Sequence, residues 1–195
     1  MRPVKEYWVP LRTAPEPLPQ RHPLRLLYEL AASLTMALAL IFVVFVFLFR
    51  PIRVDGSSMR PTLHDGDWLL VSAFSAQPER GRVAVLAESG SLHKPLVKRV
   101  IALPGDVVDI DFVAGVVTVN NIALEEPYIA EPTYNRGNLE FPLTVEPGTC
   151  FVLGDNRNHS TDSRFAAVGL VDQRNIIGQM LLHFSVFDHK TNETE

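Results

Sequence analysis

Residues 97–111 read VKRVIALPGDVVDID and decide the fold of this chain. Two short runs, 97–101 and 107–110, are rich in valine and isoleucine, which favour β-strands. The Pro-Gly-Asp segment 104–106 between them is typical of a tight turn. The stretch therefore predicts two strands joined by a turn.

The same pattern continues on both sides of this stretch. Further β-rich runs stand at residues 68–71, 83–86, 116–119 and 150–153, and a final strand is predicted at 176–187. Residues 125–142 carry many turn residues and little periodicity, so we expect a long surface excursion there. The fold class predicted for residues 51–195 is all-β.

Composition limits the function classes. The chain has 195 residues, a formal net charge of -4 and no block of Lys or Arg, so we expect no nucleic-acid partner. Cys150 is the only cysteine, which excludes an intrachain disulfide and a cysteine-based zinc cluster. Its apolar neighbours favour a core side chain over a nucleophile.

An uncharged apolar run precedes the β-rich part. Residues 30–49 contain no charged side chain and could form roughly 30 Å of helix, enough to cross a bilayer. The run ends in bulky residues and not in a small-x-small cleavage site, so we expect it to be retained as an anchor. We predict a single transmembrane helix at 29–50, because no polar face marks it as the buried helix of a soluble protein.

The flanks of this helix indicate its orientation. Residues 1–28 are rich in proline, which predicts an extended or disordered tail. More basic residues precede the helix than closely follow it, and basic flanks favour the cytoplasm. We therefore expect a single-pass protein of the cell membrane with a cytoplasmic N-terminus and an extracytoplasmic domain over 51–195.

Residues 55–63, DGSSMRPTL, follow the membrane segment. Gly56 permits close approach of the backbone to a ligand, and Pro61 disfavours helix at Arg60. Ser58 could attack a carbonyl carbon if a base removed its proton. The alternative is an ordinary serine-rich turn.

Lys98 lies inside an apolar strand pattern. Alternation places Lys98 with Val100 and Ala102 on the less polar face, opposite Arg99. A lysine on that face is buried or snorkels to solvent, and a solvent-exposed strand lysine is the alternative. The loop 154–164, GDNRNHSTDSR, packs hydroxyl, carboxylate and guanidinium groups together, which fits either a site or a soluble loop.

Together these segments resemble one family, the bacterial type I signal peptidases, which are Ser-Lys membrane endopeptidases. The family pattern S-M-x-P-T-L is met at 58–63, the pattern K-R-x-x-x-x-P-G-D at 98–106, and the pattern G-D-N-R-x-x-S-x-D-S-R at 154–164. The G-D-aromatic element after the nucleophile is met at 66–68. The motifs stand in the family's order behind an anchor. The resemblance implies a signal-peptidase-like β-fold catalytic domain.

The resemblance also implies roles. Ser58 is expected to be the nucleophile and Lys98 the general base, with the Ser160 hydroxyl orienting the lysine amine and Asp162 and Arg164 forming a supporting ion pair. No metal or organic cofactor is expected. The substrates implied are secretory preproteins that carry signal peptides with small residues before the cleavage point, and membrane lipid is the other expected partner.

The neighbours of Ser58 are expected to serve the oxyanion or the substrate. Some family members carry a serine where this chain has Gly56, so only a backbone N–H remains as a donor at that position, beside the N–H of Ser58. Ser57 stands next to the nucleophile, and an extended peptide could add to a strand edge near Met59. His159, beside Ser160, leaves a Ser-His pairing as an alternative.

The proposed role of Lys98 as a base requires that its amine be uncharged. A lysine with the ordinary pKa near 10.4 is protonated at neutral pH, and burial without a counter-charge lowers that pKa. We therefore expect Lys98 to be buried near Ser58, uncharged, unpaired and far from Asp162. Two other functions remain open: a self-cleaving Ser-Lys repressor relative, which resembles this core, and a non-catalytic membrane-tethered β domain.

Overall fold

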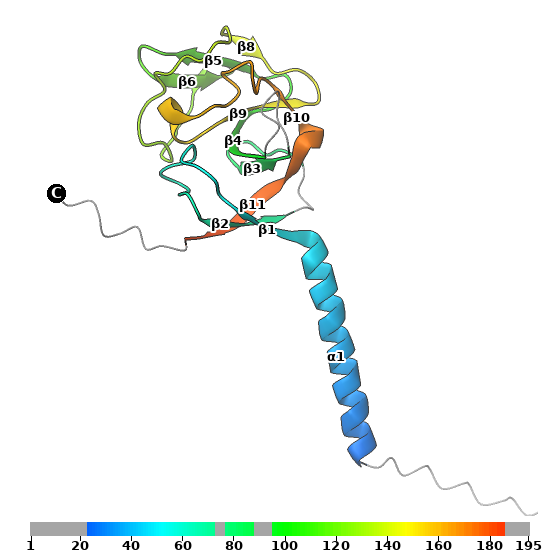
Figure 1. The fold of residues 1–195 in the computed structure, drawn as a ribbon. Helices are drawn as coiled ribbons and strands as arrows, with labels where there is room; N and C mark the ends of the chain where they lie inside the picture. The colour runs from blue at the N-terminus through cyan, green and yellow to red at the C-terminus, as the bar shows by residue number, and fades with distance from the viewer. Residues whose placement is uncertain (1–22, 73–76, 88–94, 186–195) are drawn as a thin grey trace, which may run out of the picture. The chain divides into compact units, whose positions relative to one another are not determined.

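A long apolar helix begins the described part of the chain. The computed structural model describes residues 23–72, 77–87 and 95–185. Helix α1 (Pro23–Leu48) buries none of its residues, and it is long and apolar enough to cross a membrane (Figure 1). The helix does not coincide with the transmembrane segment predicted at 29–50, which stays a prediction. The helix begins at Pro23, because proline is well tolerated in a first helical turn, and it ends at Leu48.

The residues that follow α1 are extended. Strand β1 (Phe49–Arg53) pairs antiparallel with β2 (Trp68–Ser72), so Phe49 and Arg50 belong to the sheet and not to the helix. Pro51 is tolerated because β1 is an edge strand, where a missing backbone donor breaks no ladder on the open side. Strand β1 was not predicted from the sequence, where Arg50 and Pro51 were assigned to the end of the apolar run.

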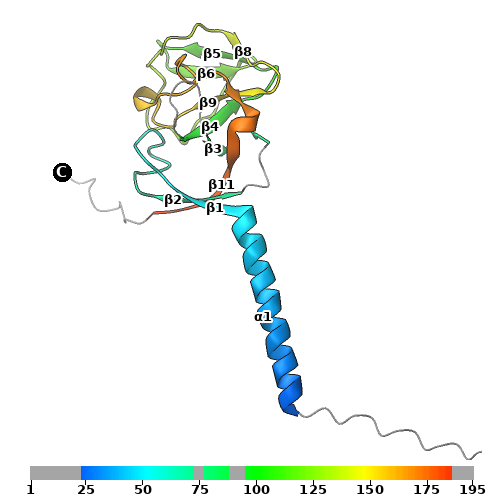
Figure 2. The same ribbon diagram turned by 45° about the vertical axis from the view of Figure 1, so that its right-hand side comes forward.

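Two antiparallel sheets form the body of the domain (Figures 1 and 2). The larger sheet has the order β1-β2-β11-β3-β4-β9-β10, and the smaller has the order β7-β6-β5-β8. The remaining strands of the larger sheet are β3 (Val83–Leu86), β4 (Leu96–Ala102), β9 (Thr149–Leu153), β10 (Val171–Asp172) and β11 (Ile176–Phe184). The smaller sheet contains β5 (Val107–Asp111), β6 (Val116–Val119), β7 (Ile122–Ala123) and β8 (Leu143–Thr144). Short 3₁₀ helices, η1 and η2, span Arg157–His159 and Gln173–Asn175.

Every strand predicted from the sequence is present, and the all-β fold class of the domain is confirmed. The final strand ends at Phe184, and the last two residues predicted for it, 186–187, lie outside the described residues. The two-residue strands β7, β8 and β10 were not predicted, because a run of two residues carries no periodicity.

Strand β4 links the two halves of the core. Its pairing with β9 shifts register between Val100 and Ala102, so the strict alternation predicted along this strand ends there. Val100 packs with Leu96 in one core cluster, whereas Ile101 and Ala102 both pack in a second cluster. The predicted grouping of Lys98 with Val100 therefore fits the strand, and the grouping with Ala102 is wrong.

Residues 125–142 contain no helix or strand, as predicted for a surface excursion, and the short strand β8 follows them. The excursion is nevertheless not entirely on the surface. Thr133 within it is fully buried, and Asn158 Oδ1 accepts hydrogen bonds from the N–H groups of Tyr134 and Asn135. The excursion therefore packs against the loop 154–164. Cys150 lies in the core as predicted, where burial, followed by the charge of Asp172, raises the pKa of its thiol to about 12.

Candidate active site

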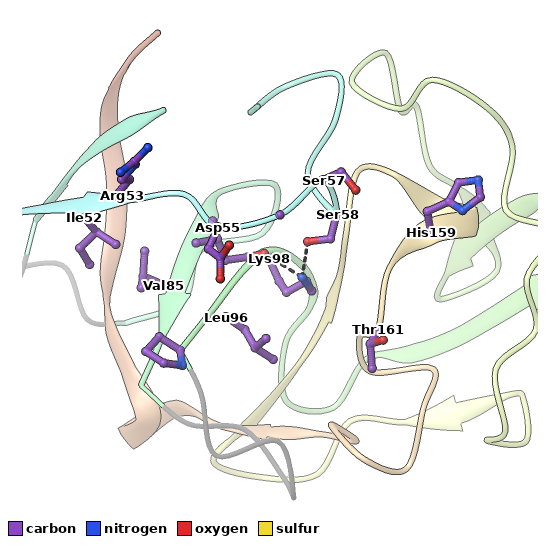
Figure 3. A pocket seen from close by; sticks show the side chains of 13 residues that line it. Ile52, Arg53, Asp55, Ser57, Ser58, Val85, Leu96, Lys98, His159 and Thr161 are labelled. Atoms are coloured by element: carbon purple, nitrogen blue, oxygen red, sulfur yellow. Dashed lines mark hydrogen bonds between the residues drawn. The ribbon is translucent and has the colours of Figure 1, made fainter. Parts of the chain in front are cut away.

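The structure brings Ser58 and Lys98 together from positions 40 residues apart. Lys98 Nζ lies 2.7 Å from Ser58 Oγ (Figure 3). Lys98 is only 3% exposed, and its Nζ also donates to the backbone carbonyl of Val97 at 3.1 Å. A hydroxyl and an amine within hydrogen-bond reach can exchange a proton, which is the geometry that an activated serine requires.

Strand β4 fixes the backbone of Lys98. It pairs with β3 on one side and β9 on the other, and Lys98 stands opposite the buried Ala84. Because both neighbours are central strands of the sheet, the lysine main chain has little freedom. The Lys98 amine is therefore held beside Ser58 by a rigid part of the fold.

The Ser58 loop is fastened to the loop after β9. The N–H of Asn156 donates to the Ser58 carbonyl at 3.0 Å, and Asn156 Nδ2 donates to the Ser57 carbonyl at 3.1 Å. Met59 is 1% exposed and packs in the core with Leu63. The Met59 side chain therefore anchors the loop in the core, and the addition of an extended peptide to a strand edge near it stays a prediction.

The backbone donors near Ser58 differ in their availability. Gly56 has a φ of 95°, a conformation that favours glycine, and its N–H donates to Asp65 Oδ1 at 2.8 Å. The predicted use of the Gly56 N–H for an oxyanion is therefore not supported, since a carboxylate already occupies it. Within the described part of the chain, no hydrogen-bond acceptor faces the N–H of Ser58, which leaves it available.

Ser160 is near the pair but does not make the predicted hydrogen bond to Lys98. Its Oγ is buried and has no hydrogen-bond partner among the described residues. Gly154 explains the tight placement of this hydroxyl, because a Cβ at Gly154 would collide with Ser160 Oγ and with the Ser58 carbonyl oxygen. The missing side chain at position 154 lets the two loops approach each other.

Asp162 and Arg164 form a buried ion pair. Arg164 Nε donates to Asp162 Oδ1 at 2.8 Å, and both side chains are fully buried. Asp162 Oδ2 also accepts from the N–H of Gly154 at 3.0 Å. These contacts fix the turn that carries Ser160, so the pair shapes the loop.

A second buried pair was missed by sequence analysis. Arg99 contacts Asp155 through Nε at 2.8 Å and Nη2 at 2.6 Å, and the fully buried Asp155 also accepts from Thr62 Oγ1 at 2.5 Å. This cluster ties strand β4, the Ser58 loop and the loop after β9 together. An arginine inside an apolar strand, next to a motif lysine, was the signal that could have found it.

A cleft of about 440 Å³ opens beside Ser58 (Figure 3). Two chain segments supply most of its wall, residues 52–53 with 55–58 and residues 95–98. Apolar side chains contribute to this wall, namely Ile52, Val85, Pro95, Leu96 and Val97. His159 and Thr161 also line the cleft, but no hydrogen bond joins His159 to Ser58 in the part of the chain that the structure describes.

The sequence matches one family along most of its length. The model of the family described as "Signal peptidase, peptidase S26" covers residues 27–185. The chain belongs to this signal peptidase family. A signal peptidase I of Bacillus licheniformis is 34% identical over 176 residues, which are 83% of this chain and 90% of that protein. The probable signal peptidase I-1 of Synechocystis sp. (strain PCC 6803) is 35% identical over 179 residues, 86% of each chain.

One solved structure is also among the proteins similar to this chain. The signal peptidase I of Enterococcus faecalis V583 is 32% identical, with a TM-score of 0.44, over 53% of this chain and 96% of that chain. The family resemblance inferred from the motifs is confirmed by these matches. As a member of the S26 family the chain is a peptidase, and its apolar helix α1 fits a membrane anchor.

Proposed function

We propose that this protein is a membrane-anchored serine endopeptidase that removes N-terminal signal peptides from secreted preproteins with a Ser58–Lys98 dyad. The observation that carries the proposal is the 2.7 Å distance between Lys98 Nζ and Ser58 Oγ at the wall of a cleft. Membership in the signal peptidase family supports the substrate class.

The reaction begins with neutral Lys98. Burial disfavours the ammonium form of an amine, and Lys98 is 3% exposed. Lys98 Nζ accepts the Ser58 proton while Ser58 Oγ attacks the scissile carbonyl carbon. The protonated lysine then gives this proton to the leaving amine as the C–N bond breaks. Water attacks the resulting ester with Lys98 again as the base, and Ser58 regains its proton.

The oxyanion of the tetrahedral intermediate needs donors beside Ser58. The N–H of Ser58 is the donor that we propose. Asn156 supports it indirectly, because its N–H holds the Ser58 carbonyl and so fixes the peptide plane of the loop. Gly56 has no side chain, so a ligand in the cleft can approach its backbone closely. Ser57 lies next to the nucleophile and takes part in no bond-forming or proton-transfer step.

The supporting residues act through the loop after β9. Asp162 and Arg164 fix the turn that carries Ser160. The buried and unpartnered Ser160 hydroxyl is available to orient the lysine amine when substrate binds, as the family resemblance implies. No metal or organic cofactor enters any step.

The cleft suits an extended peptide with small apolar side chains. Its wall includes Ile52, Val85 and Leu96, and Ser58 lines it as well. A peptide laid along the wall places short side chains against these apolar groups and its carbonyl carbon near Ser58 Oγ.

The anchor places the enzyme where its substrates are. The N-terminal tail is assigned to the cytoplasm and the β domain to the extracytoplasmic side of the cell membrane, on the basis of the charge distribution around the helix. Confinement of enzyme and membrane-inserted preprotein to one interface raises their effective concentration. Membrane lipid is therefore the second partner.

The test is cleavage of a preprotein by the purified full-length chain in lipid vesicles. Ser58→Ala and Lys98→Ala are expected to abolish cleavage. Ser57→Ala is the matched control: because Ser57 lines the cleft, loss of its hydroxyl can change KM, but kcat should stay close to that of the wild type. Cleavage that survives Ser58→Ala or Lys98→Ala would overturn the proposal, and loss of cleavage in His159→Ala would favour the Ser-His alternative.

A further inference from the structure

One short turn contacts two arginines that belong to different catalytic motifs. Glu126 and Tyr128 lie in the excursion 125–142, outside all three family motifs. Tyr128 lies against Arg99, the neighbour of Lys98. Glu126 binds Arg157, which belongs to the loop that carries Ser160.

The first contact closes the open face of Arg99. The edge of its guanidinium donates to Asp155, to Thr62 Oγ1 at 3.4 Å and to the Gly81 carbonyl at 2.7 Å. The Tyr128 ring covers its face, with the ring centroid 3.9 Å from Arg99 Cζ. A guanidinium held at its edge and on its face has a fixed plane, because stacking restrains the rotation that the edge contacts still allow.

The second contact fixes Tyr128 itself. Tyr128 Oη donates to Glu126 Oε1 at 3.0 Å. Both oxygens of the same carboxylate accept from Arg157, at 2.8 and 2.5 Å. Burial, followed by the charge of Glu126, raises the pKa of Tyr128, so its hydroxyl stays protonated and remains a donor. Arg157 is fully buried and donates to the Gly154 carbonyl at 3.0 Å, which joins the turn to the backbone beside Asp155.

These contacts form a continuous connection to the reacting atoms. Arg99 follows Lys98 in β4, and its partner Asp155 precedes Asn156, whose N–H holds the Ser58 carbonyl. A rotation of the Arg99 plane would move Asp155 and the serine loop relative to β4. That motion would lengthen the distance from Lys98 Nζ to Ser58 Oγ, on which proton transfer depends.

We propose that Tyr128, held by Glu126, is a positioning residue that sets Ser58 against Lys98 by stacking on Arg99. The inference rests on the proposed function and names one more residue that this function needs. Tyr128 does not line the cleft and touches no reacting atom. Its effect should therefore appear in the rate of the chemical step and not in substrate binding.

The test compares two substitutions in the full-length enzyme. Tyr128→Phe keeps the ring on Arg99 and removes only the hydroxyl, whereas Tyr128→Leu removes the aromatic face. We expect kcat to fall about tenfold or more in Tyr128→Leu with KM little changed, because small misplacements of reacting groups are costly. Tyr128→Phe should restore most of this rate. Thermal unfolding of both variants is measured in parallel.

A second variant keeps the inference testable if the leucine variant fails to fold. Arg99→Lys retains the positive charge beside Asp155 but loses the planar face that stacks on the ring. It should show the same loss of kcat, and where Tyr128→Leu folds, the two changes combined should lower kcat no further than either one alone. Non-additivity of this kind identifies residues that act through one contact.

The outcomes separate this inference from the proposed function. If the wild type cleaves in a Ser58-dependent way and Tyr128→Leu keeps the wild-type kcat, the positioning role is wrong and the dyad stands. If Tyr128→Leu lowers the unfolding temperature but not kcat, Tyr128 is only structural. If cleavage by the wild type does not depend on Ser58, the proposed function itself fails.

Discussion

Lys98 and the buried arginines of the same domain meet different partners. Lys98 Nζ donates to a hydroxyl and to a backbone carbonyl. Two fully buried arginines and the partly buried Arg99 each contact a carboxylate, at 2.6, 2.5 and 2.8 Å, in the pairs Arg99–Asp155, Arg157–Glu126 and Arg164–Asp162. A guanidinium keeps its charge at any ordinary pH, whereas a buried amine can lose it. In this fold the arginines hold the loops, and an amine lies beside the Ser58 hydroxyl.

The largest effect on catalysis is expected when Lys98 is replaced by an arginine. Lys98→Arg replaces a group that can deprotonate by one that cannot, so we expect kcat to fall about 10²–10⁴-fold, the usual contribution of a general base. Preprotein cleavage by the folded variant measures this. Arg60→Lys, an exposed change in the Ser58 loop, is the control and should be neutral. A Lys98→Arg variant with the wild-type rate would show that Lys98 is not the base.

The next effect should come from breaking a buried arginine pair. Asp162→Asn leaves Arg164 with an uncompensated charge where neither side chain is exposed, so we expect the free energy of unfolding to fall by about 3–5 kcal/mol. Urea denaturation measures it. Asp172→Asn is the matched control, because it breaks an equally spaced pair with Arg174, whose side chain is 88% exposed, and should change little. Equal losses in the two variants would contradict the distinction between buried and exposed pairs.

A smaller, pH-dependent effect is expected at Asp106, which is paired with the half-exposed Arg80. Burial alone would raise the pKa of Asp106, but hydrogen bonds from the N–H of Leu103, from Asn120 and from Arg80 outweigh it and lower the pKa. The stabilisation is therefore complete above the ordinary aspartate pKa and is lost as the pH falls through the lower folded value. We expect Asp106→Asn to cost about 1–3 kcal/mol near neutral pH.

Urea midpoints of the wild type and Asp106→Asn, followed from pH 7 to the lowest pH at which both stay folded, check this sign. The two midpoints should converge in acid. A gap that stays constant, or widens as the pH falls, would mean that the carboxylate of Asp106 does not contribute through its charged form.

The strands and the proximity of Ser58 and Lys98 could be predicted from the sequence, because both rest on local patterns. Residues 97–101 and 107–110 carry β-branched residues around a turn, and Ser58 and Lys98 stand in recognisable motifs. Strand β1 was missed because Pro51 is acceptable only at an edge, and which strand forms the edge depends on the whole sheet.

The supporting contacts could not be predicted, because they join residues far apart in the chain. Thr62 and Asp155 are separated by 93 residues, and no local sequence pattern predicts the hydrogen bond between them. The core packing of Met59 could not be predicted, because a motif gives the order of residues but not the direction of a side chain. The hydrogen bond of Gly56 could not be predicted either, because only the folded loop brings Asp65 to its N–H.

The central claim is that Lys98 is a neutral base at working pH. The most direct measurement is an NMR titration of the ¹³Cε-labelled lysines in the folded protein, with the Lys98 signal assigned by its absence in Lys98→Met. The account predicts that Lys98 titrates well below the ordinary lysine pKa of about 10.4 and that its midpoint matches the rising limb of kcat/KM. A Lys98 that titrates at or above the ordinary value would contradict the account.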